Sequence, residues 1–224
     1  MFGKKNVAIE PRTVDDNVLI QVSEPTKITK KTKVSVPAQY NAYAFVDQKL
    51  LFRIDACVDK EIIKICDKED IGKQIKIAFV AKRAVAQSAW GFGNIQVNNE
   101  RLKEAYRIGA NGKFSIEVLD YVKLIQSFPS SREITIDQIR EKTISTLKTI
   151  GTPILGEYFS NTNTSVFEMS SLIADFRDKF IEGLQKEKIF SEMGIKLATL
   201  TVDGFHTNEE DLEIIRNRIN ERGN

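Results

Sequence analysis

The sequence predicts an α+β fold in which a mainly antiparallel sheet packs against several helices. Two patterns support this prediction. In the first half, Tyr43 and Phe45 alternate with small or aliphatic residues, the period-two pattern of a strand with one buried face. In the second half, Phe176 and Phe180 lie four residues apart with charged residues between them, which is the spacing of an amphipathic helix. A chain of 224 residues that is 42% hydrophobic and 29% charged can build such a core.

Strands are expected throughout the first hundred residues. Residues 18–22 have the composition of a strand that pairs at a sheet edge. Residues 35–54 predict a hairpin around Asp47-Gln48-Lys49, a turn without the glycine that short hairpins favour, so its register stays open. Residues 74–81 alternate as a third strand, and Ile95 and Val97 mark a fourth that ends at Asn98-Asn99.

Helix boundaries in the second half follow from capping signals. Asp120 is expected to cap a short helix over 121–128 that ends before Pro129. Thr135 and Gln138 form a capping box for the next helix, which Gly151-Thr152-Pro153 should break or kink.

Further signals complete the chain. Ser170 or Ser171 is expected to cap a helix that ends at Gly194. Residues 195–202 form the last predicted strand, and a capping box at residues 207–210 opens a closing helix that reaches about Asn220.

No catalytic, cofactor or metal site is expected. His206 is the single histidine and is predicted to be a surface turn residue, while Cys57 and Cys66 are expected to be reduced and partly buried. One histidine and two cysteines without a CxxC spacing do not complete a zinc site. Residues 90–93, Trp-Gly-Phe-Gly, lack the lysine and spacing of a phosphate-binding loop and are interpreted as a sharp turn between strands.

The charge distribution singles out one basic segment. The net charge of +2 creates no global field, and no basic stripe interleaves with exposed aromatic residues, so nucleic acid is not an expected partner. Neither a signal peptide nor a transmembrane segment is predicted. The membrane-surface candidates are four lysines with two open interpretations, a contact with anionic lipid or a simple solvated arm: Lys27, Lys30, Lys31 and Lys33.

Four short motifs resemble the SPFH (stomatin, prohibitin, flotillin; band 7) superfamily, and within it the bacterial "virion core protein"-like branch. The motifs are VxVPAQYNAYAFV, AWGFG, IGANGKFSIEV and MGIKL, and the resemblance covers residues 6 to 208, with Phe92 where the branch usually has threonine. The resemblance implies an SPFH-like domain over 34–224, preceded by residues 1–33, whose composition predicts a mostly polar arm that is partly strand. Many family members continue into a long coiled coil, whereas this sequence predicts only a short closing helix and no long coiled coil. The resemblance also favours one long bulged strand through Asn111-Gly112, against the local hairpin signal of that dipeptide.

SPFH proteins are generally non-enzymatic scaffolds that self-assemble at membranes. The resemblance therefore implies a cytoplasmic homo-oligomer on the inner face of the cell membrane, where it organises or recruits proteins, with roles in envelope stress. The expected self-association surfaces are a sheet edge near the arm, the helix over 171–193, and the closing helix that ends in Arg216, Arg218 and Arg222. Two alternatives stay open: a soluble enzyme or small-ligand-binding domain with an unrecognised pocket, and a phage or virion structural component.

Overall fold

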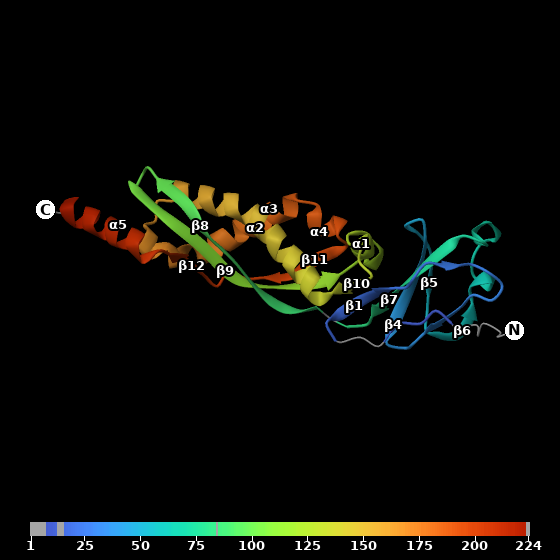
Figure 1. Ribbon diagram of the computed structural model, residues 1–224. Coiled ribbons are helices and arrows are strands. Elements are labelled where there is room, and N and C mark those ends of the chain that lie inside the picture. Colours follow the sequence, from blue (N-terminus) through green and yellow to red (C-terminus); the bar gives the residue numbers. More distant parts are fainter. Residues whose placement is uncertain (1–7, 13–15, 84, 223–224) are drawn as a thin grey trace. The chain divides into compact units, whose positions relative to one another are not determined.

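The computed structural model describes residues 8–12, 16–83 and 85–222 (Figure 1). They confirm the predicted α+β class, with antiparallel sheets and five α-helices among the described residues. The chain divides into two compact units: unit 1 comprises residues 1–84, 118–139 and 193–195, and unit 2 comprises 85–117, 140–192 and 196–224. This division cuts across the expected ranges 1–33 and 34–224, and residues 1–7 and 13–15 of the predicted arm lie outside the described residues.

Unit 1 is built on a twisted antiparallel sheet with the strand order β10-β1-β7-β4-β5, and β2 also pairs with β7. A separate pair, β3 with β6, lies beside it. The elements are β1 (Val18–Val22), β2 (Thr26–Lys27), β3 (Lys33–Val36), β4 (Tyr40–Val46), β5 (Lys49–Ile54), β6 (Cys57–Glu61), η1 (Ile62–Lys64), η2 (Lys68–Asp70), β7 (Gln74–Ala81), α1 (Tyr121–Gln126) and β10 (Glu133–Thr135).

The strand expected over 18–22 is confirmed, but its expected place at an edge is wrong. β1 pairs with β10 on one side and with β7 on the other, so it lies inside the sheet. Leu19 and Ile20 are fully buried because this strand has a covered face on each side. Much of the predicted arm is therefore part of the core of unit 1.

The predicted hairpin is confirmed as β4 and β5. Asp47 and Gln48 both have positive φ, 48° and 65°, the backbone of a type I′ turn that matches the twist of the strands. A bulge between Ala44 and Phe45 sets the register that the sequence left open. The third predicted strand is confirmed as β7, which pairs with β4 over residues 76–81 and with β2 at Gln74 and Ile75.

Unit 2 combines a four-stranded antiparallel sheet with helices. Its sheet has the order β11-β9-β12, and β8 pairs with β9. The elements are β8 (Val85–Asn99), β9 (Glu104–Val118), α2 (Ile136–Asn161), η3 (Val166–Leu172), α3 (Ile173–Lys186), α4 (Ile189–Glu192), β11 (Ile195–Leu200), β12 (Gly204–Thr207) and α5 (Glu209–Arg222); the first residues of α2 and β11 and the last of β9 belong to unit 1.

The predicted turn at residues 90–93 is wrong, because these residues lie within the long strand β8. Trp90 and Phe92 point into the core of unit 2, and the Trp90 Nε1–H donates to the Thr201 carbonyl at 3.0 Å. Gly93 and Gly109 leave room on the opposite face for the ring of His206, whose Nε2 lies 3.0 Å and 2.0 Å from the positions that a Cβ would take at those glycines. The two glycines thus make room for the His206 ring, and residues 90–93 form no turn.

The long strand through Asn111-Gly112 is confirmed as β9. Its irregularity lies in the partner strand, where the register shifts between Phe92 and Ile95 and Asn94 has a positive φ. Because Asn111 and Gly112 pair in regular register with Gly91 and Trp90, they form no hairpin turn.

Two predicted helix starts are confirmed atom by atom. The Asp120 carboxylate accepts hydrogen bonds from the N–H groups of Val122 and Lys123. Thr135 and Gln138 form the reciprocal capping box, at 2.9 and 3.1 Å. The expected break at 151–153 is wrong, since α2 continues through Pro153 to Asn161.

Three expectations for the last third are corrected. The helix over 171–193 is three pieces, η3, α3 and α4, and Leu172 precedes α3 without a side-chain cap. Residue His206 lies in strand β12, although it is exposed as predicted. The cap of α5 is Asn208, whose side-chain oxygen accepts from Glu210 N–H at 2.9 Å, instead of Thr207.

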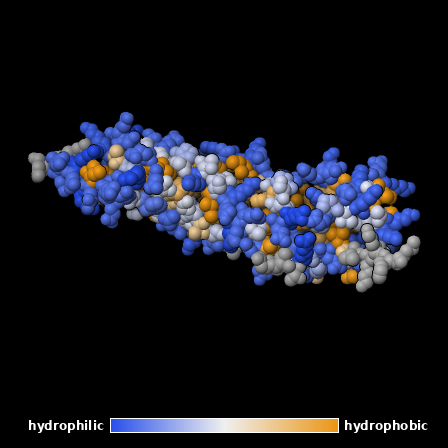
Figure 2. All heavy atoms as spheres, viewed as in Figure 1, coloured by the Kyte–Doolittle hydropathy of each residue, from blue (hydrophilic) through white to orange (hydrophobic). Residues whose placement is uncertain are grey.

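Aromatic rings form the centre of unit 2. Trp90 stacks on Phe92 at 5.2 Å between centroids, and Phe180 meets both rings edge-on. Phe176 links Phe180 to the half-buried Phe205 of β12. These contacts, together with the helices, cover one face of the sheet, while the visible surface is mostly hydrophilic with small apolar patches (Figure 2). None of the described helices has the length and apolar character that crossing a bilayer requires.

Candidate membrane-surface site

The four candidate lysines lie on a turn and its two flanking strands in unit 1. Lys30 and Lys31 are the two central residues of a β-turn closed by a hydrogen bond from Thr32 N–H to the Thr29 carbonyl, at 3.1 Å. Both lysines are exposed. The turn therefore presents two adjacent ammonium groups at the tip of an ordered loop.

Two threonines hold this turn in place. The buried Thr32 hydroxyl donates to the Lys27 carbonyl at 2.8 Å and accepts from Thr29 N–H at 2.9 Å. The Thr29 hydroxyl lies 3.0 Å from that of Thr32 and accepts from Lys31 N–H at 3.2 Å. Each hydroxyl has partners, so the local backbone bonds are satisfied without a longer strand.

The two outer lysines differ in environment. Lys27 is exposed in β2, and its side chain runs beside Gly72. Lys33 is half-buried in β3, where its ladder partner is Glu61 of β6. The structure thus groups Lys27 with Lys30 and Lys31 and places Lys33 at the base of the turn.

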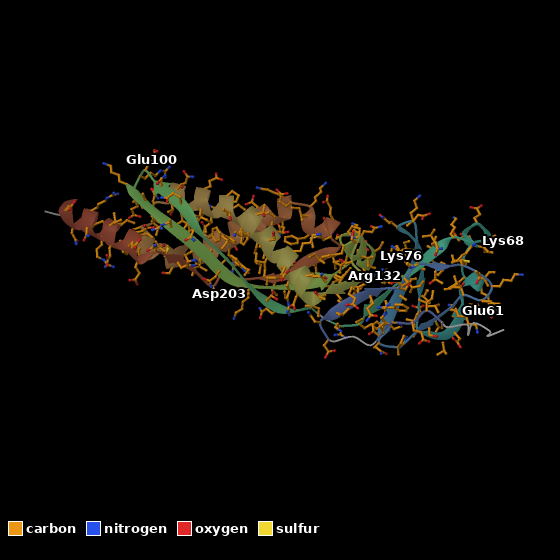
Figure 3. The ribbon with its side chains drawn as sticks, viewed as in Figure 1. Glu61, Lys68, Lys76, Glu100, Arg132 and Asp203 are labelled. Carbon is orange, nitrogen blue, oxygen red and sulfur yellow. The ribbon has the colours of Figure 1, made fainter. Side chains whose placement is uncertain are left out.

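A second loop, residues 62–73, supports the turn from the side. Ile62 N–H donates to the Thr32 carbonyl, Gly72 N–H donates to the Ile28 carbonyl, and Ile28 N–H donates to the Lys73 carbonyl, at 2.9–3.0 Å. Ile28 is fully buried and anchors the turn to the core. Lys68 lies on this second loop and is exposed (Figure 3), as is Ile71 with 45% of its surface accessible.

We call the group of Lys27, Lys30, Lys31, Lys68 and Ile71 the basic tip. Residues 26–33 and 62–73 together contain seven lysines and three acidic residues, a net charge of +4 where the whole chain has +2. The remaining sequence is therefore slightly acidic. Positive charge is concentrated on these two loops, around one exposed aliphatic side chain.

One acidic residue of the second loop, Asp70, has a structural role in it, while Asp67 and Glu69 are exposed. Asp70 is buried, and its carboxylate lies 2.8 Å from Lys73 Nζ. This hydrogen bond raises the pKa of the Lys73 ammonium above its ordinary value. Glu61 pairs similarly with Lys64 at 3.0 Å. No ion pair is formed by Lys30, Lys31 or Lys68 with another described residue, so their charges are available to a partner.

The sequence located the lysines of this site but missed Lys68 and Ile71. They lie about forty residues from the turn, and only the pairing of the two loops brings them beside it. The Thr-Lys-Lys-Thr spacing at 29–32 was the available signal for an ordered turn.

The residues with reactive side chains form no recognisable site. Cys57 and Cys66 are free and half-buried in unit 1, and burial raises the pKa of the Cys66 thiol. His206 belongs to unit 2. Across the described ranges, no group of three or more His, Cys, Asp or Glu side chains is arranged to hold a metal ion.

Comparison with known proteins adds no identification, since neither a family model nor a curated protein matches the chain. The resemblance to the SPFH superfamily stays a prediction.

Proposed function

We propose that the protein is a non-enzymatic scaffold of SPFH type that self-associates and recruits proteins at the cytoplasmic surface of a membrane. The observation that carries this proposal is the basic tip. Anionic lipid headgroups attract lysines that lie close to the surface, each by about 1 kcal/mol, and a neighbouring aliphatic side chain can enter the interface. An ordered turn loses less conformational entropy on binding than a disordered arm would lose.

The contact with a membrane would be weak and reversible. Three or four lysines act only within about a Debye length, roughly 8 Å at physiological ionic strength, and Ile71 supplies little apolar area. Such a contact suits a protein that is held at the surface by several copies together, because linked copies bind with higher avidity than one. Self-association is therefore part of the same proposal.

Strand β8 supports self-association. Within the described residues it pairs with β9 alone, so its other edge has free backbone hydrogen-bonding groups over fifteen residues. Residues 85–99 contain no charged residue and no proline, two of the features that protect edge strands, although register shifts at residues 85–88 and 92–95 interrupt the regular edge. Two copies of β8 could pair without like charges facing each other.

Vesicle co-sedimentation tests the membrane contact. Wild-type protein should bind vesicles that contain phosphatidylserine, and this binding should weaken as the salt concentration is raised. It should not bind neutral phosphatidylcholine vesicles. Replacing Lys27, Lys30, Lys31 and Lys33 by Gln should weaken binding at least tenfold.

The matched control removes the same charge from unit 2, through the exposed residues Lys103, Lys113, Lys148 and Lys188. This control variant should bind nearly as well as the wild type. If both variants bound vesicles equally weakly, net charge alone would determine the binding. The basic tip would then not be the membrane-binding surface.

A further inference from the structure

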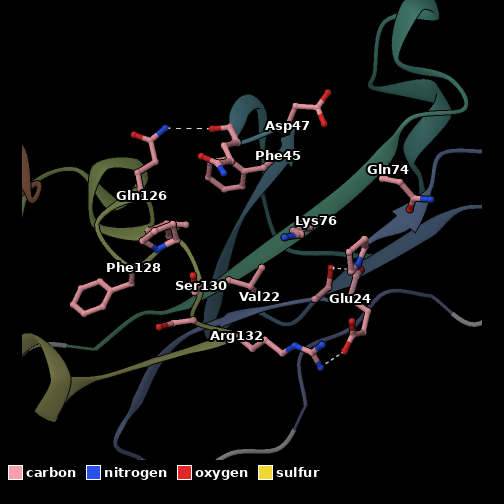
Figure 4. Close-up of a pocket in the computed structure, with 16 residues that line it drawn as sticks. Val22, Glu24, Phe45, Asp47, Gln74, Lys76, Gln126, Phe128, Ser130 and Arg132 are labelled. Atoms are coloured by element: carbon pink, nitrogen blue, oxygen red, sulfur yellow. Dashed lines mark hydrogen bonds and ion pairs between the residues drawn. The ribbon is translucent and has the colours of Figure 1, made fainter.

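Unit 1 contains a pocket of about 650 Å³ that the proposed scaffold function does not use (Figure 4). Its floor is the face of the sheet that carries Val22 and Phe45, and its walls are the β4–β5 turn, the end of α1 and the loop over residues 128–132. A volume in this range accommodates a small molecule.

The pocket is an opening in an otherwise covered core face. Ala78 and Val80 lie on this face of β7 and are completely buried. Two residues before Ala78, at Lys76, the cover ends and the face becomes accessible. Phe45, the ladder partner of Lys76, is still largely buried. The floor therefore combines aliphatic and aromatic carbon with one ammonium group.

Two interactions hold the walls in position. The Gln126 side chain donates to the Gln48 carbonyl at 3.3 Å, which ties the end of α1 to the hairpin turn. On the opposite side, the Arg132 guanidinium pairs with the Glu24 carboxylate. Both interactions join residues that are far apart in sequence, and both form within the protein itself. Because the walls are already connected, little of the binding free energy is needed to order the pocket.

The pocket lining contains two acidic residues, Glu24 and Asp47, and two basic residues, Lys76 and Arg132. Arg132 and Glu24 neutralise each other, and Asp47 points away from the pocket in Figure 4. Lys76 lines the pocket, and none of the described residues forms an ion pair with its ammonium group. A cation beside apolar walls fits a ligand with one negative charge and an apolar body.

We infer that this pocket binds a small amphipathic monoanion, with the acidic group on Lys76 and the apolar part against Val22, Phe45 and Ile125. The matched probes hexanoate, hexan-1-ol and hexylammonium share the alkyl chain and differ in charge. Hexanoate should produce saturable shifts of the backbone amide NMR signals of Val22, Phe45 and Ser130, at roughly millimolar concentration. Hexan-1-ol should bind more weakly and hexylammonium should not bind.

The variant Lys76→Gln should weaken hexanoate binding about tenfold, because it removes the charge and keeps a side chain of similar length. The control Lys148→Gln changes an exposed lysine of unit 2, outside both the pocket and the basic tip, and should leave hexanoate affinity unchanged. Equal binding of the three probes, an unchanged affinity in Lys76→Gln, or the absence of saturable shifts would each overturn the inference. The proposed membrane contact does not involve Lys76. Vesicle binding and hexanoate binding therefore test the basic tip and the pocket independently.

Discussion

Replacing Gly112 by Ala should destabilise unit 2, because strand β9 meets the Thr201 backbone at this residue. A Cβ at residue 112 would lie 1.9 Å from the Thr201 carbonyl oxygen and 2.9 Å from Trp90 Nε1. These two atoms are already joined by the hydrogen bond at 3.0 Å that ties the β11–β12 segment to β8. A backbone atom cannot swing aside as a flexible side chain can, so the strand must shift and the hydrogen bond must lengthen.

Overpacking of this kind typically costs about 1–3 kcal/mol. Trp90 is the single tryptophan, and it is buried in unit 2, so its fluorescence during urea denaturation reports on this unit. The free energy of unfolding should fall by an amount in that range.

The matched control is Gly91→Ala, in the adjacent strand. Its Cβ would meet Ala110 and Asn111 at 3.6 Å, an ordinary contact, and the substitution reduces the entropy of the unfolded chain. Its stability should therefore be unchanged or slightly higher. If Gly112→Ala unfolds within about 0.5 kcal/mol of the wild type, the close approach of β9 to Thr201 is wrong.

Two other predictions concern charge in unit 2. Asp211 accepts three hydrogen bonds from Arg107, at 2.8–3.0 Å, and these bonds lower the pKa of the Asp211 carboxyl group. The ionised carboxylate therefore stabilises the fold above the ordinary pKa of aspartate, roughly 4. This stabilisation is lost as the pH falls through the lower pKa of the folded state. In tryptophan-monitored urea titrations, the free energy of unfolding of Asp211→Asn should therefore fall less between pH 5 and roughly pH 2.5 than that of the wild type. The control Asp178→Asn removes a carboxylate from an exposed ion pair and should keep the wild-type pH dependence. Identical pH dependence of the two variants would contradict this prediction. For self-association, light scattering over a concentration series should show a monomer–oligomer equilibrium at roughly micromolar concentration. The variant Gln87→Lys on the β8 edge should shift this equilibrium severalfold toward monomer, while the control Ser145→Lys, at an exposed residue of α2, should leave it unchanged. A monomer at every concentration would remove the scaffold proposal's main support.

Local signals predicted much of the fold. The strand over 74–81 and the capping box at Thr135 and Gln138 depend on residues close in sequence, and both are confirmed. Errors occurred where distant residues decide the outcome. Gly151 and Pro153 look like a helix break, yet α2 continues because the missing side chain of Gly151 makes room for the rings of Phe92 and Phe180. Burial of that face offsets the hydrogen bond that Pro153 cannot donate.

The same limit applies to the candidate sites. The lysines at 27–33 are visible in the sequence as a charged segment, but the hydrogen bonds that join them to residues 62–73 are not. In the sequence, Lys76 is a polar residue in a strand of alternating pattern. It becomes part of a pocket because the loop over 128–132 lies near it in the fold. The sequence thus shows the chemical type of each side chain, but it does not show which distant residues lie beside that side chain in the fold.

Hydrogen–deuterium exchange of the intact protein, with and without phosphatidylserine vesicles, tests the central claim most directly. The basic tip should gain protection at the amides of residues 27–33 and 66–73, and this protection should disappear on neutral vesicles and at high salt. Amides of unit 2 that lie outside any contact between copies should exchange as they do in the free protein. Vesicle binding that leaves 27–33 and 66–73 unprotected, or that protects only other segments, would contradict the assignment of the basic tip as the membrane-binding surface.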